Sequence, residues 1–164
     1  MKICIDACTL ILLAKASVLE TVLIAYEVVT SKQVYEEVLA GKKKMFPDAL
    51  LIERLADEKK LNIVFSPEDL TKRIKQDFAM AEGEASVISC GLSQKGMIIA
   101  TDNKQGRKAA LVNGLPLVGS VDLVISLNKK KKINKKKAEE ALRILKDEGW
   151  FHPYIIEKAS EDLQ

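Results

Sequence analysis

Short apolar runs alternate with longer amphipathic segments through residues 1–118. Each run has the length of a buried strand, and the segments between the runs repeat apolar residues at helical spacing. Parallel strands joined by helices need right-handed crossovers, which bury the sheet between two helical layers. The pattern therefore predicts a three-layer α/β/α fold around a central parallel sheet of about five strands. The predicted strands are Ile3–Ile5, Val28–Val29 with its neighbours, Ile63–Phe65, Met97–Ala100 and Leu117–Val118.

Helices are predicted between these strands from apolar spacing and from the residues at their ends. Ser31 is a typical N-cap for a helix that reaches Ala40 and ends at Gly41. The pair at 113–114, Asn-Gly, is typical of a helix end. The predicted helices are Thr9–Ala25, 31–40, 46–58, 68–80, Glu82–Ser93 and Asn103–Val112.

The chain after Gly119 has helical patterning only. Residues 138–145 carry an apolar stripe at helical spacing, and Gly149 is a plausible C-cap. Three aromatic residues follow within five positions, and we expect them to dock the last helices as a plug; they are Trp150, Phe151 and Tyr154. We therefore divide the chain into a main domain, 1–128, and a lysine-rich segment with a helical arm, 129–164, packed on the same domain.

Composition narrows the possible function. The chain has 164 residues and 18.2 kDa, which favours one domain, and its 5% of aromatic residues supplies a base-stacking surface poorly. The net charge is +3, but residues 129–137 (KKKKINKKK) hold seven lysines and no acid, so the remainder carries 3 − 7 = −4. This lysine run is either a solvated surface connection or a sequence-independent phosphate contact.

The cysteines and the N-terminus bear on localisation. Three cysteines in no metal-like spacing suit a reducing compartment. The first residues superficially resemble a signal peptide, with Ala14-Lys15-Ala16 as its cleavage site, but Asp6 interrupts the apolar run. We therefore expect a cytoplasmic protein without a membrane segment.

Two predicted strands end in an acid. Asp6 follows Ile3–Ile5, and Asp102 follows Met97–Ala100 after one residue. Functional groups of open parallel sheets gather at the carboxyl ends of the strands, where the strand order reverses. If these two strands are neighbours there, their carboxylates converge. The alternative is that each Asp only caps the helix that follows it.

Helical geometry shows which of Glu82 and Glu84 faces the apolar side of its helix, but it does not decide between Glu36 and Glu37. At about 100° per residue, Glu84 lies within the apolar stripe of its helix, whereas Glu82 lies well off it. An inward carboxylate in the first turn of a helix is unusual unless it has a task. Glu36 and Glu37 lie at similar distances from the centre of their apolar face, so the wheel does not choose between them.

These residues resemble the motifs of PIN-domain nucleases, in particular an uncharacterised prokaryotic subfamily related to the toxins of VapBC pairs. The resemblance covers nearly the whole chain, and four motifs in the same order carry it. The matching motifs are Asp6-Ala7-Cys8-Thr9-Leu10-Ile11, Val34-Tyr35-Glu36-Glu37, Gly83-Glu84-Ala85 and Thr101-Asp102-Asn103 with Arg107. Two positions depart from the family pattern, because Cys8 replaces a common Ser or Asn and Asn103 replaces a frequent second Asp.

The resemblance implies a divalent-metal-dependent ribonuclease, the toxin of a toxin–antitoxin pair, with RNA, a cognate antitoxin and a second copy of itself as partners. Carboxylate oxygens without His or thiolate favour Mg²⁺ or Mn²⁺. The implied catalytic residues are Asp6, Glu37, Glu84 and Asp102. The implied metal ligands are Asp6, Glu84, Asp102 and Asn103. The implied substrate-binding residues are Lys104, Arg107 and Cys8.

A second hypothesis is a degenerate PIN fold that binds RNA or protein without catalysis. The substitutions at Cys8 and Asn103 favour it. The retention of four candidate acids argues against it, because an inactive module gains nothing from a repulsive cluster.

Overall fold

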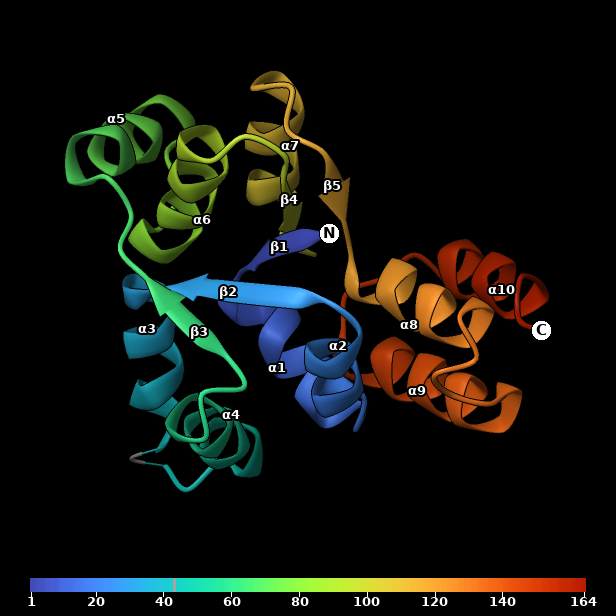
Figure 1. The fold of residues 1–164 in the computed structure, drawn as a ribbon. Helices are drawn as coiled ribbons and strands as arrows, with labels where there is room; N and C mark the ends of the chain where they lie inside the picture. Colours follow the sequence, from blue (N-terminus) through green and yellow to red (C-terminus); the bar gives the residue numbers. More distant parts are fainter. Residues whose placement is uncertain (43) are drawn as a thin grey trace.

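The computed structural model describes residues 1–42 and 44–164 and contains one sheet of parallel strands. The strand order is β3-β2-β1-β4-β5. The predicted strands are all present; the bounds of β4 and β5 are as predicted, and the others differ by one or two residues (Figure 1). The strands are β1 (Lys2–Ile5), β2 (Glu27–Ser31), β3 (Asn62–Val64), β4 (Met97–Ala100) and β5 (Leu117–Val118).

Helices cover both faces of the sheet, which confirms the predicted three-layer arrangement. In Figure 1, α5, α6 and α7 lie above the strands, and α1, α2, α8 and α9 lie below and to the right. The helices of the main domain are α1 (Ala7–Lys15), α2 (Leu19–Ala25), α3 (Lys32–Lys42), α4 (Pro47–Asp57), α5 (Glu68–Phe78), α6 (Glu82–Ser93), α7 (Lys104–Val112) and α8 (Ser120–Lys129).

The central strands are apolar because they are buried on both faces. Ile3, Cys4 and Ile5 of β1 and Ile99 and Ala100 of β4 have no exposed surface. A strand that is buried on both sides reads as a continuous apolar run instead of an alternating one. This explains why the sequence pattern located β1 and β4 well.

The prediction of one helix over Thr9–Ala25 is wrong. The chain forms α1 and α2, and the two helices meet at an angle of 113°. Ser17 between them has φ 56°, a left-handed conformation that ends a helix. The apolar spacing continues through the break because both helices bury the same kind of side chain in the core. Among the described residues no single helix is both long and apolar enough to cross a membrane, although this bent pair together meets those two criteria.

The C-terminal arm consists of α9 (Lys135–Glu148) and α10 (Pro153–Glu161), which pack on α8 and on each other. Gly149 is the C-cap of α9, as predicted, and His152 caps α10 by accepting from the Tyr154 amide at 3.3 Å. The predicted aromatic plug is wrong for two of its three residues. Trp150 is 104% exposed and Tyr154 is 62% exposed, so only Phe151 packs inward.

The apolar residues of α10 itself replace that plug. Ile156 and Ala159 of α10, and Leu163 just after its end, are buried against the core. Pro153 starts a new helix and turns the chain, so the stripe that docks the arm begins after the aromatic residues instead of within them.

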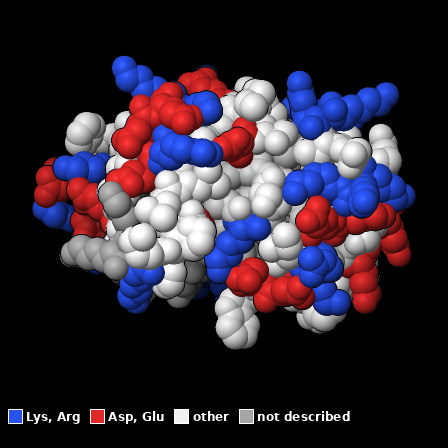
Figure 2. All heavy atoms as spheres, turned by 90° about the horizontal axis from the view of Figure 1, so that it is seen from below, with Lys and Arg blue, Asp and Glu red and all other residues white. Residues whose placement is uncertain are grey.

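The lysine run covers the end of α8, the following turn and the first turn of α9. Six of its seven lysines are exposed, and Lys130 lies over the ring of Tyr26 at 4.3 Å. In Figure 2, Lys and Arg side chains gather at the right-hand end of the molecule, over α8 and α9. The run is thus a basic surface on ordered helix ends.

Candidate active site

The order of the strands reverses between β1 and β4. From β1 the chain builds outward to β2 and β3, and it then crosses over to place β4 on the other side of β1. Ile5 pairs with Ala100 in the last register of this strand pair. Asp6 and Asp102 therefore leave the sheet side by side at its switch point, which is where open α/β sheets place their sites.

Asp6 is a buried carboxylate that caps α1. One oxygen accepts from the Thr9 amide at 2.8 Å, and the other accepts from the Thr101 hydroxyl. Only 2% of the residue is exposed. Burial raises the pKa of Asp6 to about 6, although the hydrogen bonds from Thr101 and Thr9 oppose the shift. Asp6 therefore caps α1 and at the same time contributes a carboxylate to the candidate site.

Asp102 is the second acid at this edge. Its carboxylate accepts from the Ser120 amide at 3.0 and 3.1 Å, which ties it to the start of α8. It also accepts from the Thr9 hydroxyl at 3.1 Å. Burial raises the pKa of Asp102, while the hydrogen bonds from Ser120 and Thr9 and the charge of Arg107 lower it.

Glycine lets the chain pass close to this second acid. A methyl group on Gly119 would lie 2.6 Å from Asp102 Oδ1, which is closer than any side chain can approach. The β5–α8 connection therefore reaches the carboxylate only because residue 119 has no side chain.

Glu84 faces the same edge from the first turn of α6. It is half-buried and lies close to Asp6, Thr101 and Gly106. Glu82 points away, is exposed, and lies 3.7 Å from Lys75. The structure therefore separates these two glutamates in the way that the helical wheel predicts.

Glu37 and Glu36, which the wheel could not separate, have different surroundings. Glu36 pairs with Lys32 at 3.6 Å on the outer surface of α3. Glu37 turns toward α6, and a methyl group on Gly83 would lie 2.5 Å from Glu37 Oε2. Burial first, and then the charge of Glu84, raises the pKa of Glu37. Glu37 and Glu84 thus interact across the start of α6.

Cys8 is exposed and lies near all four acids. Partial desolvation of its thiol, and then the charges of Asp6, Asp102, Glu84 and Glu37 in that order, raise the pKa of the thiol to about 12. A thiol with such a pKa stays protonated at neutral pH and is a poor nucleophile. The sequence-predicted acids are therefore gathered around a neutral side chain.

Asn103, a predicted metal ligand, lies at the start of α7. Its side-chain oxygen accepts from the amides of Gln105 and Gly106 at 2.8 and 3.1 Å, so it is the N-cap of α7. Both hydrogen bonds use the oxygen that a cation would require. Asn103 is therefore a helix cap, as Asp6 is for α1.

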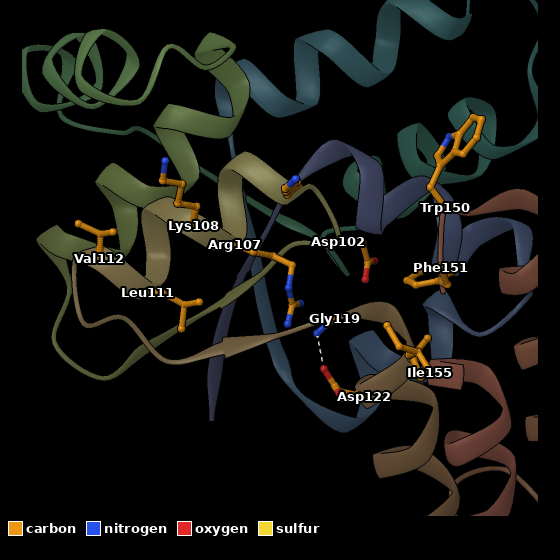
Figure 3. A pocket seen from close by; sticks show the side chains of 12 residues that line it. Asp102, Arg107, Lys108, Leu111, Val112, Gly119, Asp122, Trp150, Phe151 and Ile155 are labelled. Carbon is orange, nitrogen blue, oxygen red and sulfur yellow. Dashed lines mark hydrogen bonds between the residues drawn. The ribbon is translucent and has the colours of Figure 1, made fainter. Parts of the chain in front are cut away.

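Lys104, Arg107 and Lys108 lie along α7, beside Asp102. They line one wall of a groove whose other wall comes from the residues after α9 (Figure 3). Arg107 donates to the Thr101 carbonyl oxygen at 3.2 Å and points toward Gly119. Cations thus lie at the rim of the acidic edge.

The oxygen atoms of the four carboxylates are the kind of ligand that a hard cation binds. Four carboxylates lie at one edge, and none of them forms an ion pair with another described residue. Oxygen donors of this kind are the ones that Mg²⁺ and Mn²⁺ prefer. Within residues 1–42 and 44–164, however, no three His, Cys, Asp or Glu side chains form a group already closed around one ion position.

Sequence reasoning missed the residues that hold the acids in place. Thr9, Thr101 and Ser120 each hydrogen-bond to Asp6 or Asp102 and are almost completely buried. Their signal in the sequence is adjacency, because Thr101 directly precedes Asp102 and Thr9 is three residues after Asp6. A small polar residue within one turn of a strand-end Asp could have been selected for that reason.

The fold and this edge define a class: a parallel α/β domain with acidic side chains at its switch point. The DUF3368 family, a PIN domain, matches residues 2–162, so this chain belongs to the PIN-domain family. A search of curated proteins finds no match to the chain. PIN domains are generally nucleases that act on nucleic acids and use divalent metals.

Proposed function

We propose that this protein is a divalent-metal-dependent ribonuclease that hydrolyses RNA phosphodiester bonds. The observation that carries the proposal is the group of four acids near Cys8, none of which forms an ion pair among the described residues, although the charge of Arg107 acts on Asp102. Uncompensated carboxylates repel one another and cost stability. A bound divalent metal ion would offset that repulsion, which gives a functional reason for the cluster.

Asp6, Glu84 and Asp102 are the residues proposed to hold the ion. Asp6 and Asp102 are fixed by hydrogen bonds from threonine and from the α8 backbone, so their carboxylates need little rearrangement. Bound Mg²⁺ or Mn²⁺ would neutralise charge on the scissile phosphate and make water more acidic. Glu37 either ligates as well or accepts a proton from the attacking water, since its raised pKa suits a base.

The rim residues have separate proposed roles. Lys104 and Arg107 contact phosphate groups of the substrate as they enter the acidic edge. Cys8 is a neutral neighbour of the reacting phosphate, because its protonated thiol adds no charge to the cluster. Asn103, originally a candidate ligand, supports the site as the cap that orients α7.

The proposed biological role is that of a cytoplasmic toxin with a cognate antitoxin and a homodimeric state. It rests on the resemblance of the four motifs to VapBC toxins. Expression alone should arrest growth, and co-expression with the product of an adjacent small gene should relieve the arrest. If growth is unaffected while the purified protein cleaves RNA, the toxin role fails and the nuclease role remains.

A second candidate is the degenerate PIN fold without catalysis. The specific observation in its favour is that Asn103 caps α7 and that no three-ligand group is closed among the residues described. Under this reading the acids are only structural, and RNA or protein binding would not depend on a metal ion.

One experiment separates the two candidates. Purified protein is incubated with mixed cellular RNAs in Mn²⁺, Mg²⁺ or EDTA, beside Asp6→Asn, which keeps the cap on α1. The nuclease account predicts cleavage with either metal and none with EDTA or with Asp6→Asn. Equal cleavage by wild type and Asp6→Asn, or no cleavage in any condition, would favour the degenerate fold.

A further inference from the structure

A groove lies between α7 and the residues that follow α9 (Figure 3). Its volume is about 660 Å³, which lies in the range of small-ligand sites. Asp102 lines it, so the groove continues directly into the acidic edge. A ligand in the groove would therefore lie beside Asp102 and next to the acidic edge.

Trp150 stands at the margin of this groove with its indole free. It is the only tryptophan in the chain and is 104% exposed, so no part of the ring packs on the protein. In Figure 3 the ring points outward while Phe151 next to it points inward. A fully exposed indole is costly to hydrate and is a ready surface for stacking.

The wall opposite Trp150 combines charge with apolar surface. Lys104, Arg107 and Lys108 are spaced at i, i+3 and i+4 on α7, and none of them forms an ion pair within the described part of the chain. Leu111 and Val112 continue the same helix and are 67% and 68% exposed. Unpaired cations beside bare apolar surface match a ligand that carries both phosphates and flat rings.

We propose that this groove is a nucleotide subsite, in which Trp150 stacks on an unpaired base while the cations of α7 hold the flanking phosphates. The inference rests on the proposed ribonuclease function for the identity of the ligand as RNA. Stacking needs an exposed base face, so the occupant is a single strand. An uncharged protein segment would satisfy the apolar wall but would not match the positive charge of the three α7 side chains.

The test uses the fluorescence of Trp150 to report binding. Full-length protein in EDTA and low salt, where RNA is not cleaved, is titrated with a single-stranded RNA dodecamer and with the same sequence as a duplex. We expect saturable quenching of tryptophan emission by the single strand and little by the duplex. Emission that no oligonucleotide changes, or that changes only with protein concentration, would overturn the subsite.

Variants then measure the contribution of the ring by anisotropy of a labelled RNA. Trp150→Ala should weaken single-strand binding by about 5- to 150-fold, since stacking on one base has that effect, and Trp150→Phe should restore most of it. The matched control is Tyr154→Ala, an exposed aromatic that does not line the groove. Thermal melts confirm folding, which an exposed position should leave unchanged.

Cleavage assays distinguish this inference from the proposed function. With Mn²⁺, Trp150→Ala should raise KM by a similar factor and leave kcat within about twofold, because stacking is the same in ground and transition states. Normal cleavage with unchanged KM in Trp150→Ala overturns the subsite and leaves the ribonuclease standing. Quenching and binding without cleavage in any metal support the subsite and overturn the ribonuclease.

Discussion

Thr9 and Asp102 hold each other across the switch point of the sheet. The Thr9 hydroxyl donates to Asp102 Oδ2 at 3.1 Å, and the Asp102 amide donates to the same hydroxyl at 3.0 Å. Thr101, which directly precedes Asp102, donates in turn to Asp6. Each acid is therefore held by a threonine on the other acid's segment, and the end of β1 is fastened to the end of β4.

This arrangement predicts a pH-dependent cost for Thr101→Val. The change keeps the shape of the side chain but leaves one oxygen of Asp6 without its donor, at a cost of about 1–3 kcal/mol. The loss should be larger at pH 7.5 than at pH 4.5, because the hydrogen bond favours the ionised carboxylate. Urea denaturation at both pH values measures it.

Thr71→Val is the control for that variant. Thr71 is as buried as Thr101, and its hydroxyl donates to the Pro67 carbonyl oxygen instead of to an acid. Its loss should be the same at both pH values. If the loss of stability in Thr101→Val also does not depend on pH, Asp6 does not ionise between pH 4.5 and pH 7.5.

The buried acids should make the metal-free protein less stable as pH rises. The folded-state pKa of Asp6 is raised to about 6 from an ordinary value of 3.8, so the folded protein binds the proton more tightly than the unfolded chain. The contribution is fully present below pH 4 and is lost as pH rises through 6. Burial raises the pKa of Asp102 in the same direction.

Asp6→Asn isolates this effect, because the amide can still cap α1 and still reach Thr101. Its stability relative to wild type in EDTA should increase between pH 4 and pH 7 by up to about 3 kcal/mol and then level off. Thermal or urea denaturation across that range measures the difference. A difference that does not change with pH would show that Asp6 keeps an ordinary pKa.

Two pairs of neighbouring glutamates, Glu36 with Glu37 and Glu82 with Glu84, provide matched tests of activity. Glu84→Gln and Glu37→Gln should each reduce RNA cleavage by at least 100-fold, a loss typical of a removed catalytic group. Glu82→Gln and Glu36→Gln change the same helices on their outer faces, where the side chains pair with Lys75 and Lys32. These two controls should stay within about twofold of wild type; a similar loss in either would mean that charge alone, and not position, matters.

The lysine run at the α8–α9 turn should affect affinity without affecting chemistry. Each lysine that contacts phosphate contributes about 0.7 to the slope of log affinity against log salt on single strands. Changing residues 129–132 to serine should lower that slope and leave the rate at saturating RNA unchanged. An unchanged slope would identify the run as solvated surface only.

The fold could be predicted in large part because burial on both sheet faces leaves a strong apolar signal. Ile3–Ile5 and Met97–Ala100 are such strands, and their predicted bounds are close to those of β1 and β4. The break at Ser17 could not be predicted, since apolar spacing continues through it and no Gly or Pro marks it. The exposure of Trp150 was missed because aromatic residues are usually read as core.

The candidate site could also be predicted from the sequence only in part. Strand ends and a helical wheel were enough to select Asp6, Asp102 and Glu84. The choice of Glu37 over Glu36 depends on how α3 packs against α6, and a single helix does not carry that information. Asn103 is a predicted ligand because oxygen chemistry allows it, and its position before α7 also makes it a helix cap, which the sequence analysis does not predict.

Calorimetric titration with Mn²⁺ at pH 7.5 tests the central claim most directly, because it asks whether the four acids act as one site. Wild type and Glu82→Gln should show saturable binding with the same affinity. Asp6→Asn and Glu84→Gln should each lose most of it, and Mn²⁺ should raise the melting temperature only of the proteins that bind. Binding that survives in Glu84→Gln, or no binding by wild type, would contradict the account of a metal-dependent nuclease.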